Sequence, residues 1–138
     1  MVSVSARTAL AAGRKRAERL MTSRVEVRRF TGETVIDDET LIEAPVYDVV
    51  YSGRAKVASY EAFEQTPEAA GGVVTVVRLR VDFPVGSFVA KPGDEAHVLS
   101  DSSDPLLGGR RFRLTVAAPY KSHATAYRVA AEEVTDDA

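Results

Sequence analysis

The sequence predicts a mainly β fold: a small antiparallel β-barrel or sandwich of about six or seven strands, preceded by an amphipathic α-helix. Three observations lead to this prediction. Residues 77–83 and 112–116 alternate between apolar and polar side chains, which is the period that lets a strand bury one face. Turn sequences rich in proline and glycine separate such runs. The first residues instead repeat their apolar side chains with the period of a helix.

The size and composition of the chain fit one globular domain. An apolar fraction of 45% over 138 residues is ordinary for a folded protein of this size. The absence of cysteine excludes disulfides and thiolate metal sites. No apolar run approaches the roughly 20 residues that a membrane span needs, and Arg14-Lys15-Arg16 lies where a signal peptide would be apolar. We therefore expect no membrane partner.

Charge is distributed unevenly along the chain. The net charge is −2, but residues 1–30 hold eight basic and two acidic side chains, while the remaining residues hold 10 basic and 18 acidic ones. A basic end and an acidic body can attract each other between copies of the chain, and they can also attract external partners.

The predicted helix covers residues 5–21 within a basic N-terminal segment, residues 1–22. Its apolar residues fall within about 120° of one another and are Ala6, Ala9, Leu10, Gly13, Ala17, Leu20 and Met21. This stripe is narrow and rich in alanine, so the helix needs another surface to lie on. Its basic residues, the candidate docking residues, are Arg7, Arg14, Lys15, Arg16 and Arg19. They can form a solvated face, a docking surface for a protein, or a contact for DNA phosphates.

The predicted barrel domain spans residues 23–134, and an acidic tail, residues 135–138, follows. Strands are expected at residues 24–30, 46–51, 54–57, 77–83, 95–99, 111–116 and 125–134. Turns are expected at residues 31–34, 37–39, 52–53, 91–94, 100–104 and 108–109. Pro92-Gly93 has the chemistry of a type II turn. We expect the strands between residues 71 and 117 to form an antiparallel meander.

Residues 59–72 do not fit the strand pattern, and we expect a long inserted loop there. The segment holds Glu61, Glu64 and Glu68, contains no basic residue, and ends in Gly71-Gly72. It is far longer than the usual hairpin connection of about 2–5 residues. Loops of this length are commonly functional or mobile, and both interpretations remain open.

The sequence contains no recognisable catalytic or metal-binding pattern. His97 falls in a strand and His123 in a loop, without partners at the spacing of a metal site. The acidic turns at residues 37–39 and 101–104 lack the calcium-loop pattern, and residues 108–111 lack the lysine of a phosphate-binding loop. We expect neither an enzyme nor a cofactor or metal.

The order of several segments resembles a known family. After the basic helix, a strand and an acidic turn, these segments are residues 51–57, 76–84, 91–94, 104–116 and 126–134. Over nearly the whole chain this order is similar to that of the head completion, or head-to-tail stopper, proteins of long-tailed phages, particularly those of actinobacterial hosts.

The resemblance implies a β-barrel subunit of a homo-oligomeric ring, commonly a dodecamer, in the virion neck, assembled in the host cytoplasm. The ring would lie between the portal adaptor and the tail, close the channel after DNA packaging, and offer a surface to the tail. In similar stoppers a loop between strands gates the double-stranded DNA. By position this would be residues 59–72, with Glu61, Glu64 and Glu68 facing the channel and Gly71-Gly72 as a hinge.

Two other functions remain open. One is a neighbouring component of the same neck, the tail terminator or the adaptor. The other is a nucleic-acid-binding barrel that uses the arginines of one sheet face, Arg78, Arg80, Arg111 and Arg113. These arginines form one basic patch if their two strands are neighbours.

Overall fold

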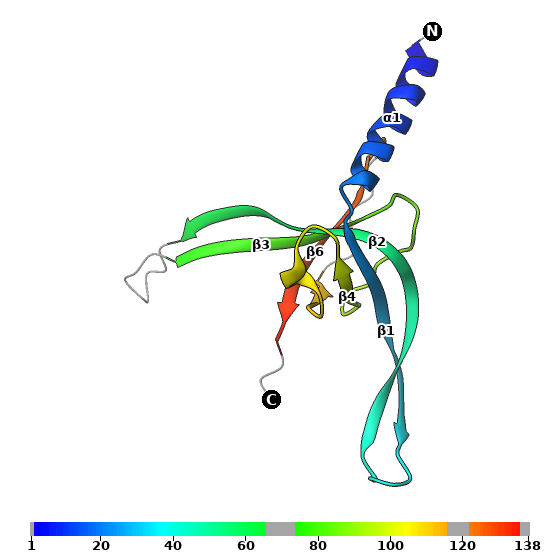
Figure 1. Cartoon of the computed structure of the whole chain (residues 1–138), viewed down its shortest axis with the longest axis vertical. Helices are drawn as coiled ribbons and strands as arrows, with labels where there is room; N and C mark the ends of the chain where they lie inside the picture. Colours follow the sequence, from blue (N-terminus) through cyan, green and yellow to red (C-terminus); the bar gives the residue numbers. More distant parts are fainter. Residues whose placement is uncertain (1, 66–73, 116–121, 136–138) are drawn as a thin grey trace.

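The computed structural model describes residues 2–65, 74–115 and 122–135, with side chains for all of these except residues 2–4, 60–65 and 74–78. A helix projects from a small sheet structure, and two long strand pairs extend from it (Figure 1). The elements are α1 (Val2–Arg19), β1 (Ser23–Ile36), β2 (Glu43–Gln65), β3 (Val74–Phe83), β4 (Glu95–Asp101), the 3-10 helix η1 (Pro105–Leu107), β5 (Arg111–Leu114) and β6 (Tyr127–Val134).

The six strands form a closed antiparallel barrel in the order β1-β2-β3-β6-β5-β4, with β4 pairing back onto β1. The predicted fold class, mainly β with one N-terminal helix, is confirmed. The pairing of β4 with β1 closes the sheet, and alternation lets each strand turn every second side chain toward the shared interior. The fully buried side chains of this interior include Val25, Val27, Val81, Phe83, Leu114 and Val129.

Aromatic rings cover one region of this core. Phe88 lies in the connection between β3 and β4, and its ring centroid is 4.8 Å from that of Phe83 in an edge-to-face contact. Tyr51 stacks on Phe88 at 5.3 Å, and Tyr127 meets the same ring at 5.9 Å. The connection is therefore packed onto the barrel by a side chain of its own.

The predicted meander is wrong at the step from β3 to β4. β3 pairs with β2 and β6, whereas β4 pairs with β1 and β5. The connection, residues 84–94, crosses to the far side of the barrel instead of forming a hairpin. The turn within it is confirmed, because Asp94 N donates to Lys91 O at 3.1 Å and Gly93 has a φ of +95°.

β1 and β2 are longer than predicted. The expected turn at residues 31–34 belongs to β1, where a register shift and Gly32 at a φ of +89° absorb the irregularity. The expected break at residues 52–53 lies inside β2. Gly53 is needed there because Tyr51 folds over it to donate to Arg54 O at 2.6 Å, so a Cβ on Gly53 would lie 2.7 Å from the hydroxyl.

The expected loop at residues 59–72 is also corrected in its first half. β2 continues to Gln65, which pairs with Val74 at the start of β3. Glu61 and Glu64 are therefore strand residues, paired with Arg78 and Thr75 in a two-stranded ribbon beyond the pairing of β3 with β6. Glu68, Gly71 and Gly72 lie outside the described residues.

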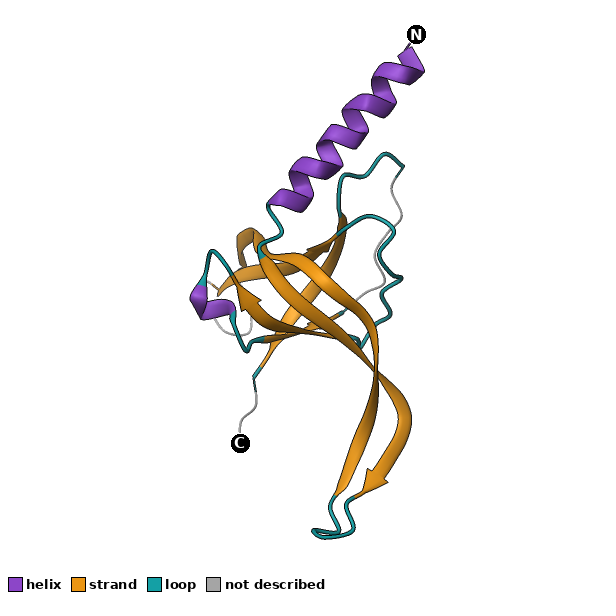
Figure 2. Cartoon of the chain, turned by 45° about the vertical axis from the view of Figure 1, so that its right-hand side comes forward, coloured by secondary structure: helices purple, strands orange, loops and turns teal. Residues whose placement is uncertain are grey.

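Two strand pairs extend beyond the barrel in different directions (Figure 1). The β1–β2 arm, defined here as residues 29–49, begins where the pairing of β1 with β4 ends at Arg28. The β2–β3 arm comprises residues 59–65 and 74–78, beyond the pairing of β3 with β6. Figure 2 shows that α1 and the β1–β2 arm lie at opposite ends of the molecule.

Candidate interaction surfaces

The second half of α1 is anchored on the barrel of its own chain. Gly13 approaches Thr125 so closely that a Cβ on the glycine would lie 2.9 Å from Thr125 Cγ2. Arg14 Nε donates to Ala124 O at 3.1 Å. At the helix end, Arg54 reaches the carbonyl oxygen of Glu18 at 3.4 Å. These contacts fix the direction in which the helix projects.

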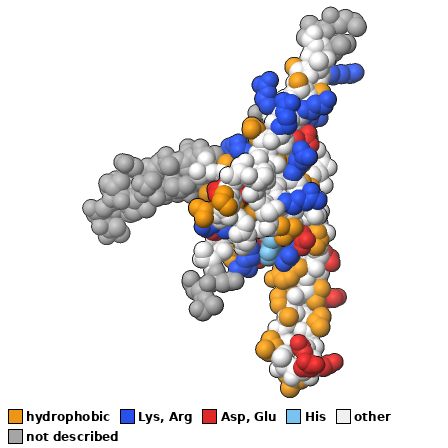
Figure 3. All heavy atoms as spheres, viewed as in Figure 1, with side chains coloured by type: hydrophobic (Ala, Val, Ile, Leu, Met, Phe, Trp, Pro, Cys, Tyr) orange, Lys and Arg blue, Asp and Glu red, His pale blue; other side chains and the backbone are white. Residues whose placement is uncertain are grey.

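The first half of α1 is uncovered. Residues 5–9 are exposed, including Ala6 and Ala9 of the predicted apolar stripe. Four of the predicted docking residues, Arg7, Lys15, Arg16 and Arg19, are exposed as well. The fifth predicted docking residue differs, because Arg14 is half-buried against its own chain. Basic side chains gather along the helix and the adjoining end of the barrel (Figure 3).

One face of the β1–β2 arm carries a row of exposed large apolar side chains. The register places Phe30 opposite Tyr47, with ring centroids 5.8 Å apart, and places Arg28 opposite Val49. Directly opposed residues share a face, and so do alternate residues of one strand. The apolar residues of this face, called the arm face below, are Phe30, Ile36, Tyr47 and Val49, and their exposed fractions run from 44% to 57%. Sequence reasoning missed this surface.

The tip of the same arm is acidic. Residues 30–46 contain five carboxylates and no basic side chain, and the carboxylates are Glu33, Asp37, Asp38, Glu39 and Glu43. Asp37 shapes the turn, since its Oδ1 accepts hydrogen bonds from the backbone of Glu39 at 2.8 Å and Thr40 at 3.4 Å. Leu41 is 78% exposed beside these charges. Figure 3 shows apolar side chains along the arm and acidic ones at its end.

The base of the arm is fixed by a buried carboxylate. Arg29 Nε and Nη2 donate to the two oxygens of Asp94, each at 2.9 Å, and Nη2 also donates to Val89 O at 3.0 Å. Asp94 is 2% exposed and also accepts from Lys91 N at 2.9 Å. The hydrogen bond to Asp94 raises the pKa of Arg29 above its ordinary value, although burial opposes it. The arm therefore leaves the barrel at a defined position.

The family of the chain is established by a match over most of its length. The model of DUF6093, a family of unknown function, matches residues 13–132. The chain belongs to this family. No curated protein and no solved structure matches the chain. The region shared with DUF6093 contains the whole β1–β2 arm and the anchored half of α1.

The strands that carry the four sheet arginines of the DUF6093 chain are not neighbours, so the condition for one basic patch is not met. β6 lies between β3 and β5 and separates Arg80 from the two arginines of β5. Each of these three has a carboxylate nearby: Arg80 Nε lies 3.0 Å from Asp82, Arg111 Nη1 3.7 Å from Glu95, and Arg113 Nη1 3.3 Å from Glu132. The side chain of Arg78 is outside the described part, and its backbone lies opposite Glu61.

The two histidines lie apart. His97 is half-buried in β4, with Nε2 3.7 Å from Glu95 Oε1, and burial together with Arg28 lowers its pKa below the ordinary value. His123 is exposed at a φ of +62°. Among the described residues, no three side chains that could ligate a metal come together. In the same part of the chain, no helix has the length and apolar character to cross a membrane.

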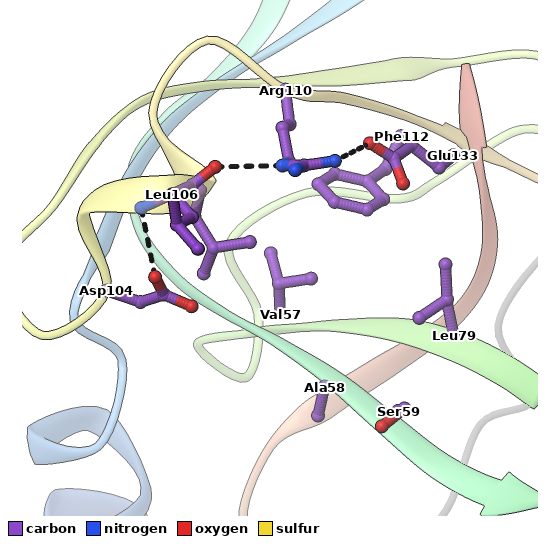
Figure 4. Close-up of a pocket in the computed structure, with 10 residues that line it drawn as sticks. Val57, Ala58, Ser59, Leu79, Asp104, Leu106, Arg110, Phe112 and Glu133 are labelled. Carbon is purple, nitrogen blue, oxygen red and sulfur yellow. Dashed lines mark hydrogen bonds and ion pairs between the residues drawn. The ribbon is translucent and has the colours of Figure 1, made fainter. Parts of the chain in front are cut away.

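A shallow pocket lies where η1 meets the sheet (Figure 4). Its volume is about 330 Å³, and Val57, Leu79, Leu107 and Phe112 form much of its lining. Arg110 lies across the pocket, where Nε donates to Leu106 O at 2.8 Å and Nη1 to the carboxylate of Glu133. Arg110 and Glu133 thus bind each other, while the carboxylate of Asp104 accepts from Leu106 N at 2.9 Å, so each charged group that lines the pocket has a partner within the chain.

Proposed function

We propose that this chain is a structural subunit of the head-to-tail connection of a long-tailed phage: a stopper whose ring closes the DNA channel after packaging and offers a docking surface to the tail. The observation that carries the proposal is the pair of strand arms and the helix that extend from a barrel too small to cover them. The resemblance of the sequence to head completion proteins supports placing the assembly in the neck of the virion, between the head and the tail.

The arms fit a subunit of an assembly better than a protein that acts alone. A two-stranded ribbon is marginally stable in water, and exposed large apolar side chains add to the free-energy cost of leaving it uncovered. The β1–β2 arm has both properties, since its arm face is about half exposed. Packing against neighbouring subunits removes this cost, and a homo-oligomeric ring gives every copy the same neighbours.

The β2–β3 arm is the proposed gate. Glu61 and Glu64 lie in β2, and Glu68 lies in the segment that joins the two strands. Between residues 59 and 77 the chain has these three carboxylates and no basic side chain. An acidic lumen repels DNA phosphates, so the duplex slides instead of binding. With strands reaching Gln65, opening becomes a swing of the arm about its ends, a hinge motion.

Two measurements test this function. Electron microscopy of the particle neck, with this chain traced in the density, should place a ring of it between the portal adaptor and the tail. A position at the tail end would identify a terminator instead, and one against the portal an adaptor. Salt-dependent binding of DNA by the isolated chain, with no copy in the neck, would contradict the proposal.

The gate has its own test. Replacing Gly71 and Gly72 with alanine should impair DNA retention or release, because alanine narrows the backbone freedom that a hinge needs. Gly108→Ala is a matched control, since the Cβ built at Gly108 meets its nearest atom at 3.8 Å. Normal packaging and infection by the Gly71→Ala/Gly72→Ala phage would rule out the hinge. The proposal that the chain forms a ring in the neck would be unaffected.

A further inference from the structure

We infer that the β1–β2 arm of one copy docks on α1 of a second copy, so that copies join head to tail through two different surfaces. This inference rests on the proposed function for its setting in a ring. The arm face would lie along the uncovered half of α1, and the acidic tip would lie near the exposed basic side chains of the same helix.

Charge complementarity identifies the second copy as the occupant of the arm. The tip holds five carboxylates over residues 30–46 without a basic side chain. Within α1, basic residues outnumber the single acidic residue, Glu18, and Lys15 and Arg16 are exposed. Opposite charges at an interface speed the encounter and fix the register, and like charges disfavour the alternatives of tip against tip or helix against helix.

The apolar parts of the two surfaces also match. The arm face offers Phe30, Ile36, Tyr47 and Val49. The uncovered half of α1 offers Ala6 and Ala9, whose small side chains let a flat row of larger ones approach the helix closely. Gly13 and Arg14 are already in contact with the helix's own barrel, so they hold this surface in place.

The position of the two surfaces dictates the kind of assembly. They lie at opposite ends of the molecule (Figure 2), so an arm cannot reach the helix of its own chain. A contact between two different surfaces is heterologous, and it generates a ring when the rotation closes and a filament when it does not. The same contact therefore supplies the repeated joint that a ring needs.

The test reverses charge on either side of this contact. Asp38→Lys/Glu39→Lys changes the tip but spares Asp37, whose carboxylate shapes the turn. Lys15→Glu/Arg16→Glu changes the helix but spares Arg14, which anchors it. Sedimentation velocity of the full chain over a range of concentrations at about 50 mM salt should show association that weakens at about 0.5 M salt. Each double variant should weaken it at least about tenfold.

Mixing the two reversed chains is the decisive step. Alone, neither should associate as strongly as the parent, because the first variant sets lysines of its tip against a basic helix and the second sets glutamates of its helix against an acidic tip. In the mixture, the lysines of the altered tip can meet the glutamates of the altered helix, and the unaltered tip can meet the unaltered helix, so association should recover. Val49→Ser should weaken association of the unreversed chain, because it removes apolar area from the arm face.

Matched controls keep the result specific. Glu132→Lys reverses an exposed charge on β6, and Leu106→Ser removes an apolar side chain that is 73% exposed on η1. Neither should change association. Unfolding midpoints of all variants verify that each is folded, which is expected because every altered residue is at the surface.

Three results would overturn the arm–helix contact. Oligomers that form equally well from both reversed variants would mean that the ring uses another interface. A chain that stays monomeric at low salt, while microscopy finds it as a ring in the neck, would refute this contact but leave the proposed function standing. Loss of DNA-duplex binding in Lys15→Glu/Arg16→Glu, with unchanged association, would assign the helix to nucleic acid.

Discussion

The guanidinium of Arg29 in β1 forms two parallel hydrogen bonds with the buried carboxylate of Asp94, each 2.9 Å long. The two residues are 65 positions apart in the sequence. Their contact joins the base of the β1–β2 arm to the connection that crosses the barrel. Because Asp94 also accepts from the backbone of Lys91, one carboxylate fixes a strand and a turn together.

Replacing Arg29 with methionine should therefore destabilise the protein by about 3 kcal/mol, since it leaves the Asp94 carboxylate buried without its cation. Urea denaturation measures this loss. Arg113→Met is the matched control, because its partner Glu132 is exposed, and it should cost at most about 1 kcal/mol. Equal losses for the two variants would mean that burial of Asp94 does not govern the effect.

Gly13→Ala should lower the unfolding midpoint, although alanine is the better helix former by about 1 kcal/mol. The added Cβ would meet Thr125 Cγ2 at 2.9 Å and push the helix off its anchor. Thr125→Ser removes that methyl group. The double variant should recover the loss and exceed the parent midpoint, as alanine then contributes its helix propensity. A stabilising Gly13→Ala alone would show that the helix does not need this close contact.

The stability of the fold should decrease as pH falls from about 7 to 5. Burial, with a contribution from Arg28, lowers the pKa of His97 in the folded state, so the unfolded chain binds the proton more readily. The stabilisation is present above the pKa that His97 has in the unfolded chain, and it is lost as pH falls through the lower pKa that His97 has in the folded chain. His97→Gln should flatten this slope in urea titrations at a series of pH values, and a slope unchanged in His97→Gln would contradict the prediction.

Asp82→Asn should raise the urea midpoint near pH 7. Asp82 is 4% exposed, and burial raises its pKa even though Arg80, Arg128 and Lys56 favour the ionised form. A raised pKa means that stability is lost as pH rises through the folded value, so the neutral amide removes a penalty. The difference should vanish near pH 3, where the acid is protonated in both states. A less stable Asp82→Asn at pH 7 would mean that the three cations outweigh burial.

The sequence predicted best those strands that have one face in the core. β3, β4 and β6 carry alternating apolar residues because each wall of the barrel has one dry side, and Val81 and Val129 are both fully buried. The turn at residues 91–94 followed from Pro92 and Gly93, whose backbone preferences are local. Residue preferences and alternation were sufficient wherever neighbouring residues determine the backbone conformation.

The arms were missed for the same physical reason. Residues 31–34 and 59–65 lie in strand segments that extend beyond the closed part of the barrel, where no alternation is required to fill its core. The glycines at positions 32 and 53 suggest breaks, but one serves a bulge and the other makes room for Tyr51. One signal was available: in the predicted strand at residues 46–51, apolar side chains stand at both odd and even positions, 46, 47, 49 and 50, which indicates apolar residues on both faces of the strand.

The remaining surfaces depend on contacts between distant parts of the chain. Periodicity gives no strand order, so the separation of Arg80 from Arg111 and Arg113 by β6 could not be foreseen. The pairing of Arg29 with Asp94 is equally invisible in a single sequence. The structure describes the two predicted sites to different extents. The predicted docking residues of the helix are exposed except for Arg14, which is half-buried, whereas Glu68, Gly71 and Gly72 of the predicted gate lie outside the described residues.

Closure of the barrel has a consequence for how copies can meet. In the described chain, the β1–β2 arm carries strand edges without a partner, because β1 has run past β4. Such edges invite backbone pairing between molecules and, with it, fibrous aggregates. Pro45 sits within that ladder and has no amide proton to give, and the carboxylates at the tip repel their counterparts on a like arm. The arm is thus protected against indiscriminate sheet extension, which leaves recognition to its side chains.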